Sequence, residues 1–128
     1  MPLQEPRRSA DEMRVLELFC GLGGMRLGLE RALAAAGDRR PRTYTAVDTS
    51  PTAAAAYEAN FPGAKCHRKN IESLPASTFE GHDVWMMSPP CQPFTATANA
   101  HQRDLDDPRC SALKAMHTYA APGTTTMP

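Results

Sequence analysis

The sequence lacks an excess of charge of either sign, because 14 lysines and arginines balance 14 aspartates and glutamates. The net charge therefore gives no indication of a nucleic-acid partner. The chain also lacks a signal peptide and any long apolar stretch, which predicts an intracellular protein of the cytoplasm or nucleus with no membrane span. Its 128 residues allow one compact domain at most, with a modest core. Composition says nothing of the oligomeric state.

The cysteines lack both the Cys-x-x-Cys spacing of a metal site and the density of a secreted disulfide scaffold. They are Cys20, Cys66, Cys91 and Cys110. We therefore expect reduced thiols and no metal site. A thiol redox protein is disfavoured, since no second cysteine lies two or three residues from Cys91.

No internal repeat is present, and both ends of the chain lack a helical or strand pattern. We expect a disordered arm over residues 1–13 and a disordered tail over residues 118–128. Residues 14–117 alternate in a βαβα manner, which predicts an α/β fold with helices packed on a mostly parallel sheet.

The first unit is a strand over Arg14–Phe19 that runs into a glycine-rich turn at Cys20–Gly24. A helix over Met25–Ala36 follows, and Gly37 is placed to end it. The apolar positions of this helix have spacings of three and four and predict one buried face: Met25, Leu29, Ala32, Leu33 and Ala36. The dinucleotide pattern G-x-G-x-x-G does not fit, because its sixth position is Arg26. The turn brings backbone amides close to a ligand or is a plain tight turn.

The second unit is a strand over Thr43–Val47 that ends on Asp48, followed by a helix over Pro51–Asn60. Proline suits the first helical turn, where its missing N–H has no intrahelical partner. Asp48 lies 24 residues after Gly24, near the interval expected for an acid that accepts hydrogen bonds from a ribose. The alternative is that Asp48 helps to cap the following helix.

Two further strands are predicted, a weaker one over 64–71 and an apolar one over Asp83–Met87. The weaker strand ends at Asn70 and Ile71. The amide of Asn70 can read an adenine edge or can belong to an ordinary loop.

A proline-rich loop, Ser88-Pro-Pro-Cys-Gln-Pro-Phe-Thr95, follows the last strand. Proline fixes φ and removes a backbone donor, so this loop holds Cys91 stiffly at the carboxyl end of a strand, where open α/β sheets bind ligands. A thiol in that place is a candidate nucleophile once its pKa is lowered. A buried structural cysteine is the alternative.

Three segments in this order resemble the opening motifs of the cytosine-C5 methyltransferases: Phe19–Gly24, Ala46–Asp48 and Pro89–Phe94. The loop at 88–95, with Asp106–Arg109 after it, is most similar to the branch that methylates transfer RNA. The likeness covers Arg14 to Met116. Amino-group methyltransferases differ, because their corresponding loop carries Pro-Pro-aromatic and no nucleophile.

The resemblance implies a Rossmann-like, doubly wound domain that uses S-adenosylmethionine and acts on nucleic acid, with transfer RNA preferred over DNA. It implies that Cys91 adds to C6 of cytosine. The residues that match the family's cofactor contacts are Phe19, Leu22, Gly23, Gly24, Asp48, Asn70, Ile71 and Ser88. Of these, Leu22–Gly24 match the loop under the methionine part, Asp48 the ribose acid, and Asn70 with Ile71 the adenine contacts.

The chain also departs from the family pattern. The segment Ala96–Ala100 stands where relatives usually carry a glycine after the cysteine loop. Asn70 replaces the acidic residue that is often found at the adenine-binding position. The family's Glu-Asn-Val segment, arginine pair, target-recognition region and final helix do not occur before Pro128. We therefore expect a sheet truncated after about four strands, an apolar edge at Asp83–Met87 and no activity of the chain alone. A non-catalytic cofactor-binding or interaction fragment is the alternative.

Overall fold

The computed structural model describes residues 11–89 of the chain. Four parallel strands form one sheet in the order β3-β2-β1-β4. The strands are β1 (Met13–Leu18), β2 (Arg42–Asp48), β3 (Cys66–Arg68) and β4 (Val84–Met87). The helices are α1 (Gly24–Ala35), α2 (Pro51–Asn60) and the short 3-10 helices η1 (Ile71–Ser73) and η2 (Ala76–Phe79).

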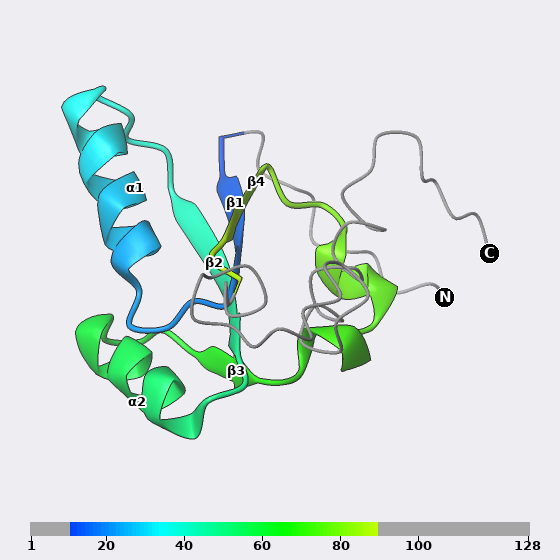
Figure 1. Cartoon of the computed structure of the whole chain (residues 1–128). Coiled ribbons are helices and arrows are strands. Elements are labelled where there is room, and N and C mark those ends of the chain that lie inside the picture. The colour runs from blue at the N-terminus through cyan, green and yellow to red at the C-terminus, as the bar shows by residue number, and fades with distance from the viewer. Residues whose placement is uncertain (1–10, 90–128) are drawn as a thin grey trace, which may run out of the picture.

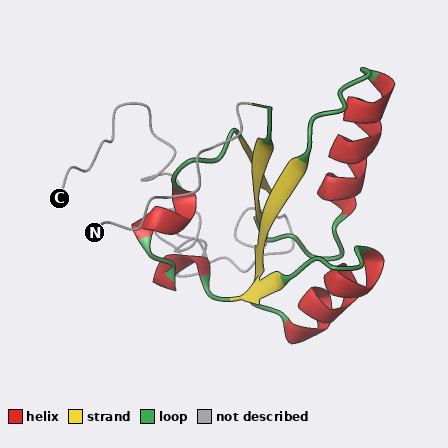
Figure 2. Ribbon diagram, turned by 180° about the vertical axis from the view of Figure 1, so that it is seen from behind, coloured by secondary structure: helices red, strands yellow, loops and turns green. Residues whose placement is uncertain are grey.

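Helical elements lie on both sides of the sheet, with α1 and α2 on one side and η1 and η2 on the other (Figure 1). The reverse view shows the same separation (Figure 2). Two groups of buried side chains match these two sides, one centred on Leu16 and Leu18 and the other on Ala54 and Tyr57. The Rossmann-like, doubly wound α/β fold with a parallel sheet is confirmed.

The central strand β1 has a neighbour on each side, and its apolar run is buried on both faces. Val15, Leu16 and Leu18 are completely buried, as expected for a strand covered on both faces of a parallel sheet. Leu18 is in register with Val47 of β2 and with Met87 of β4. Three strands therefore end at one level and present their carboxyl ends side by side.

Helix α2 has the bounds that the sequence predicts, because its start is determined by local signals. The Ser50 hydroxyl accepts a hydrogen bond from the Ala53 N–H at 3.2 Å, and Pro51 occupies the first turn. Such a capping hydroxyl satisfies one of the amides that have no partner within the helix. On the inner face of α2, Ala54 and Tyr57 are buried against the sheet.

The buried face that the sequence predicts for helix α1 is only partly correct. The helix ends near Gly37, which has φ 76° as a C-terminal glycine should. None of its residues is fully buried, however, and Ala32 and Ala36 are exposed. Arg26 and Glu30 take inward positions with Met25, Leu29 and Leu33, which are only half-buried. A layer of polar and aromatic contacts therefore separates α1 from the sheet.

The other boundaries differ slightly from the predictions. Strand β1 begins at Met13, which is buried at 6% exposure although the expected arm included it. Strand β3 is shorter than the expected strand over 64–71, because Asn70 turns the chain into η1. Within residues 11–89, β4 pairs with β1 alone and forms the edge expected for the fourth strand, with side chains partly buried.

Candidate functional site

The strand order places a topological switch point between β1 and β4. From β1 the chain proceeds to β2 and β3 on one side, and β4 then returns to the other side of β1. Open α/β sheets bind ligands at such a point, outside the carboxyl ends of the strands. Phe19 directly follows β1 and Ser88 directly follows β4. The Ser88 N–H donates to the Leu18 carbonyl at 3.4 Å, so the structure brings these two predicted residues together.

The loop between β1 and α1 has an unusual backbone. Gly21 and Gly23 have φ angles of 53° and 91°, and Phe19 is the one non-glycine residue with positive φ among those described, at 55°. A phenylalanine rarely adopts this conformation, and strain of this kind gathers at functional sites. The Asn60 amide donates to the Leu22 carbonyl at 2.9 Å, while the Leu22 side chain is 63% exposed.

Glycine is required at Gly23 for a second reason. A Cβ atom there would lie 2.1 Å from Cε2 of Phe61 and 3.1 Å from Cδ2 of Tyr57. At Gly21 and Gly24, in contrast, a Cβ would meet nothing within 4 Å. The loop is therefore tightly packed against Phe61 and Tyr57 at Gly23, and it has open space beside Gly21 and Gly24.

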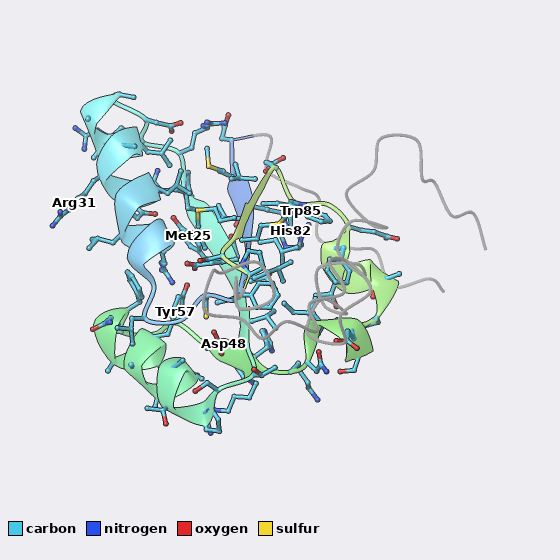
Figure 3. The ribbon with its side chains drawn as sticks, in the orientation of Figure 1. Met25, Arg31, Asp48, Tyr57, His82 and Trp85 are labelled. Carbon is cyan, nitrogen blue, oxygen red and sulfur yellow. The ribbon has the colours of Figure 1, made fainter. Side chains whose placement is uncertain are left out.

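Asp48 connects this loop to the start of α2. Its Oδ2 accepts a hydrogen bond from the Gly21 N–H at 3.0 Å, and its Oδ1 accepts one from the Ser50 N–H at 2.8 Å. Ser50 is the capping residue of α2, so Asp48 supports the turn before the helix rather than capping it. A carboxylate has about four acceptor positions, so Asp48 retains the capacity to bind ribose hydroxyls. Figure 3 shows its position at the end of β2.

The predicted adenine residues lie just after β3. The Asn70 Oδ1 accepts a hydrogen bond from the Glu72 N–H at 3.1 Å and caps η1. Ile71 is only 3% exposed and packs in the core cluster with Leu16 and Leu18. Little of Ile71 is therefore open to a ligand. The candidate nucleophile Cys91 lies outside the described residues, two positions after the last of them, Pro89.

The structure adds one residue to this region that the sequence analysis missed. Glu17, in β1, is completely buried. The Tyr57 hydroxyl donates to its Oε2 at 2.8 Å, and its Oε1 has no hydrogen-bond partner among the described residues. Burial raises the pKa of Glu17 above the ordinary value of a glutamate. The sequence signal was available, because Glu17 interrupts an otherwise apolar strand.

Tyr57 also links this carboxyl group to α1. The Arg26 Nη1 donates to the Tyr57 hydroxyl at 3.1 Å, and its guanidinium lies 4.0 Å from the ring centre of Tyr44 and 4.3 Å from that of Phe61. Such cation–π contacts are favourable when partly desolvated. Figure 3 shows Tyr57 between α1 and α2, with Arg31 pointing away from the sheet. Arg26 thus connects the first turn of α1 to β2 and α2, and through Tyr57 to Glu17 of β1.

The described residues contain no group of three or more potential metal ligands and no helix long and apolar enough to cross a membrane. Their parallel sheet, the glycine loop after β1 and the acid after β2 define an α/β domain of the type that binds nucleotide cofactors.

The comparisons with known proteins are more specific. Residues 13–115 match the family of C-5 cytosine-specific DNA methylases, and the chain belongs to this family. A tRNA (cytosine(38)-C(5))-methyltransferase of Schizosaccharomyces pombe is 38% identical over 107 residues, which are 82% of this chain and 30% of the relative. The Homo sapiens protein of the same name is 35% identical over 105 residues, which are 80% of this chain and 25% of the relative.

A solved structure of the Entamoeba histolytica methyltransferase EhMeth is also similar. It matches with a TM-score of 0.68 and 30% identity, over 84% of this chain and 32% of that one. The resemblance inferred from the motifs is confirmed. The chain spans about a quarter to a third of the length of these relatives.

Proposed function

We propose that this chain supplies the cofactor site and the nucleophile for methyl transfer from S-adenosylmethionine to C5 of cytosine in nucleic acid, with transfer RNA preferred over DNA. The observation that carries the proposal is the glycine loop at the switch point, held by Asp48 and followed after β4 by the proline-cysteine loop. The S. pombe and human relatives, named for transfer RNA, support the preference for RNA.

The residues present fit such a cofactor. S-adenosylmethionine carries an ammonium group, a carboxylate and ribose hydroxyls, and when bound it supplies a methyl group on a sulfonium. Glu17 offers a buried carboxyl oxygen without a partner among the described residues, and the space beside Gly24 is open at the N-terminus of α1, where helix amides favour anionic groups. Leu22–Gly24 would hold the methionine part and Asp48 the ribose. Phe19, Ser88 and the segment Asn70–Ile71 would complete the site.

Cys91 has the chemical role in this proposal. C5 of cytosine is a poor nucleophile until its ring loses aromatic character. The Cys91 thiolate forms an S–C6 bond, and the electrons of the C5–C6 double bond move toward C5, which gains enamine character. After methylation, loss of the C5 proton and cleavage of the S–C6 bond restore the ring and the thiolate. The target base must leave its stack to reach the cysteine.

Calorimetric titration with S-adenosylmethionine tests the cofactor site in the chain itself. We expect weak binding that Asp48→Ala reduces further, because this carboxylate both holds Gly21 and offers acceptors to the ribose. Asp38→Ala is the matched control, since Asp38 pairs with Arg40 just before β2 begins, at the other end of the strand from Asp48. A submicromolar dissociation constant would contradict the expected weak binding, and equal binding by Asp48→Ala and wild type would contradict the role proposed for Asp48.

Methyl transfer is tested in a chimera in which this chain is followed by the part of the S. pombe relative that it does not match. We expect Cys91→Ser to abolish transfer to transfer RNA while leaving cofactor binding intact. Cys110→Ser is the control for loss of a thiol elsewhere in the chain. Transfer at the wild-type rate by Cys91→Ser would remove this residue from the mechanism, and faster transfer to DNA would reverse the substrate preference.

The alternative is a non-catalytic cofactor-binding or interaction fragment. The observation in its favour is that the chain spans only 25% to 30% of the curated relatives. We propose that the 128 residues alone do not turn over, because proton-transfer partners contribute about 10²–10⁴-fold to such reactions and the expected acid does not occur in this sequence. An inactive chimera with intact cofactor binding would favour the fragment.

A further inference from the structure

Two cysteine side chains, one from the glycine loop and one from β3, are in contact with each other. Cys20 is the residue after Phe19 in the loop, and Cys66 is the first residue of β3. They are 46 residues apart, yet their Sγ atoms lie 3.3 Å from each other. Both cysteines are free and buried, with exposures of 4% and 3%. The sequence analysis missed this pair because the two cysteines share no local spacing.

The backbone around both thiols is fixed. The Cys20 N–H donates to the Val47 carbonyl at 3.2 Å, which continues the pairing of β1 with β2 by one step. Cys66 belongs to β3, which pairs with the other edge of β2, and it is in register with Ala46 of β2. Its N–H donates to Oε1 of Glu58 at 3.0 Å. The approach of the two sulfur atoms is therefore imposed by the sheet and by α2.

The side chains packed against the pair are mostly apolar, and three carboxyl groups act on it from nearby, those of Glu17, Asp48 and Glu58. Cys20 and Cys66 pack in one cluster with Ala46, Ala54 and Tyr57. No group of three metal ligands exists among the described residues, so the pair is not part of a metal site there. A disulfide bond needs a sulfur separation of about 2.05 Å. The two Sγ atoms, 3.3 Å apart, must therefore come a little more than 1 Å closer for the bond to form.

We propose that Cys20 and Cys66 form a disulfide when the chain meets a peroxide-class oxidant, and that this bond fastens the glycine loop to β3. One thiolate attacks a peroxide oxygen, which gives a sulfenic acid and releases hydroxide. The second thiolate attacks that sulfur, forms the S–S bond and expels a second hydroxide. With the two thiol protons, the balance is two thiols and one hydrogen peroxide giving one disulfide and two waters.

Burial determines how fast this oxidation proceeds. It raises the pKa of both thiols above their ordinary values, and the reactive species is the thiolate. Oxidation is therefore slow near neutral pH and becomes faster as the pH rises. The product closes a long loop of chain, which stabilises the folded state chiefly by restricting the unfolded one.

Oxidation of the double variant Cys91→Ala/Cys110→Ala tests the proposal, because Cys20 and Cys66 are then the remaining thiols. After hydrogen peroxide at pH 8 to 9, we expect the intact mass to fall by two hydrogen atoms. Peptide mapping should show one crosslinked peptide pair that contains Cys20 and Cys66. The midpoint of thermal unfolding should rise by roughly 10 °C, and a reductant should reverse the rise.

The matched control is the same background with Cys66→Ser, which should show neither the crosslink nor the rise. In the chain with all four cysteines, the same peptide pair should dominate. Free thiols after oxidation, crosslinks of Cys20 or Cys66 to other cysteines, or an unchanged midpoint would each overturn the proposal.

A second readout concerns the cofactor and rests on the proposed function. A tether behind the loop orders it before the ligand arrives, so the oxidised chain should bind S-adenosylmethionine at least as tightly as the reduced chain. Loss of binding on oxidation would overturn the fastening role. Absence of binding in the reduced chain would instead refute the proposed function and leave the crosslinking result to be judged separately.

Discussion

Gly23→Ala is the substitution whose effect the structure defines most sharply. Gly23 precedes the first turn of α1 and has φ 91°, a conformation that favours glycine. The added methyl would lie 2.1 Å from a ring carbon of Phe61. That ring is in contact with Tyr57 at a centroid distance of 5.0 Å, and the Arg26 guanidinium lies 4.3 Å from its centre. Phe61 therefore has little freedom to move aside.

Two effects add in this variant. A non-glycine residue in the left-handed region costs about 1–2 kcal/mol, and forcing an extra carbon into a packed site costs about 1–3 kcal/mol. Together they should lower the free energy of unfolding by about 2–5 kcal/mol, a large fraction of the about 5–15 kcal/mol of a typical domain. At roughly 3–5 °C for each kcal/mol, the thermal midpoint should fall by at least about 6 °C.

Gly28→Ala provides the control with the opposite sign. Gly28 lies inside α1, and a Cβ there would meet nothing within 4 Å. Alanine in a helix interior is favoured over glycine by about 0.5–1 kcal/mol. Thermal unfolding followed by far-ultraviolet circular dichroism compares the two variants directly. If Gly23→Ala melts no lower than wild type, or if both variants shift in the same direction, the reasoning about the packed glycine is refuted.

Three further substitutions test the polar layer under α1. Burial raises the pKa of Glu17, so the folded state keeps this proton to higher pH than the unfolded state and loses stability as the pH rises above about 4.3. Glu17→Gln should flatten that decline in melts at a series of pH values, and an unchanged slope would contradict it. The Arg42 guanidinium lowers the pKa of Glu30, so this ion pair should stabilise the folded state above about pH 4.3 and lose that contribution as the pH falls. Glu30→Gln should remove this loss of stability at acid pH. A series of melts in which the same loss persists in the variant would argue against the pair. Tyr57→Phe removes the hydroxyl between Glu17 and Arg26 and should lower the free energy of unfolding in urea by about 1–3 kcal/mol, a value near zero being the contrary result.

Those parts of the fold that depend on local signals could be predicted from the sequence. Helix α2 has the expected bounds, because Ser50 and Pro51 determine its start within a few residues. Strands β1, β2 and β4 follow from short apolar or β-branched runs, and their parallel pairing follows from the alternation of strands and helices. The glycine turn after β1 and the acid after β2 could be placed at one edge of the sheet for the same reason.

The remaining features depend on partners that are distant in the sequence. The inward position of Arg26 is explained by Tyr57 and by the ring of Tyr44, and that of Glu30 by Arg42, all of which belong to other elements. An apolar period could therefore identify only the Met25, Leu29 and Leu33 part of the inner face of α1. The approach of the Cys20 and Cys66 thiols likewise depends on the register of three strands.

The contacts of the glycine loop explain how a cofactor site can be both fixed and open. Two polar bonds hold the loop in place, since Asp48 accepts from the Gly21 N–H and Asn60 donates to the Leu22 carbonyl. Other parts of the loop are uncovered, with open space beside Gly24 and an exposed Leu22 side chain. These bonds fix the orientation of the Gly21 amide and of the Leu22 carbonyl. The loop can therefore present preorganised donors to a ligand, and its geometry depends on β2 and α2 as much as on its own sequence.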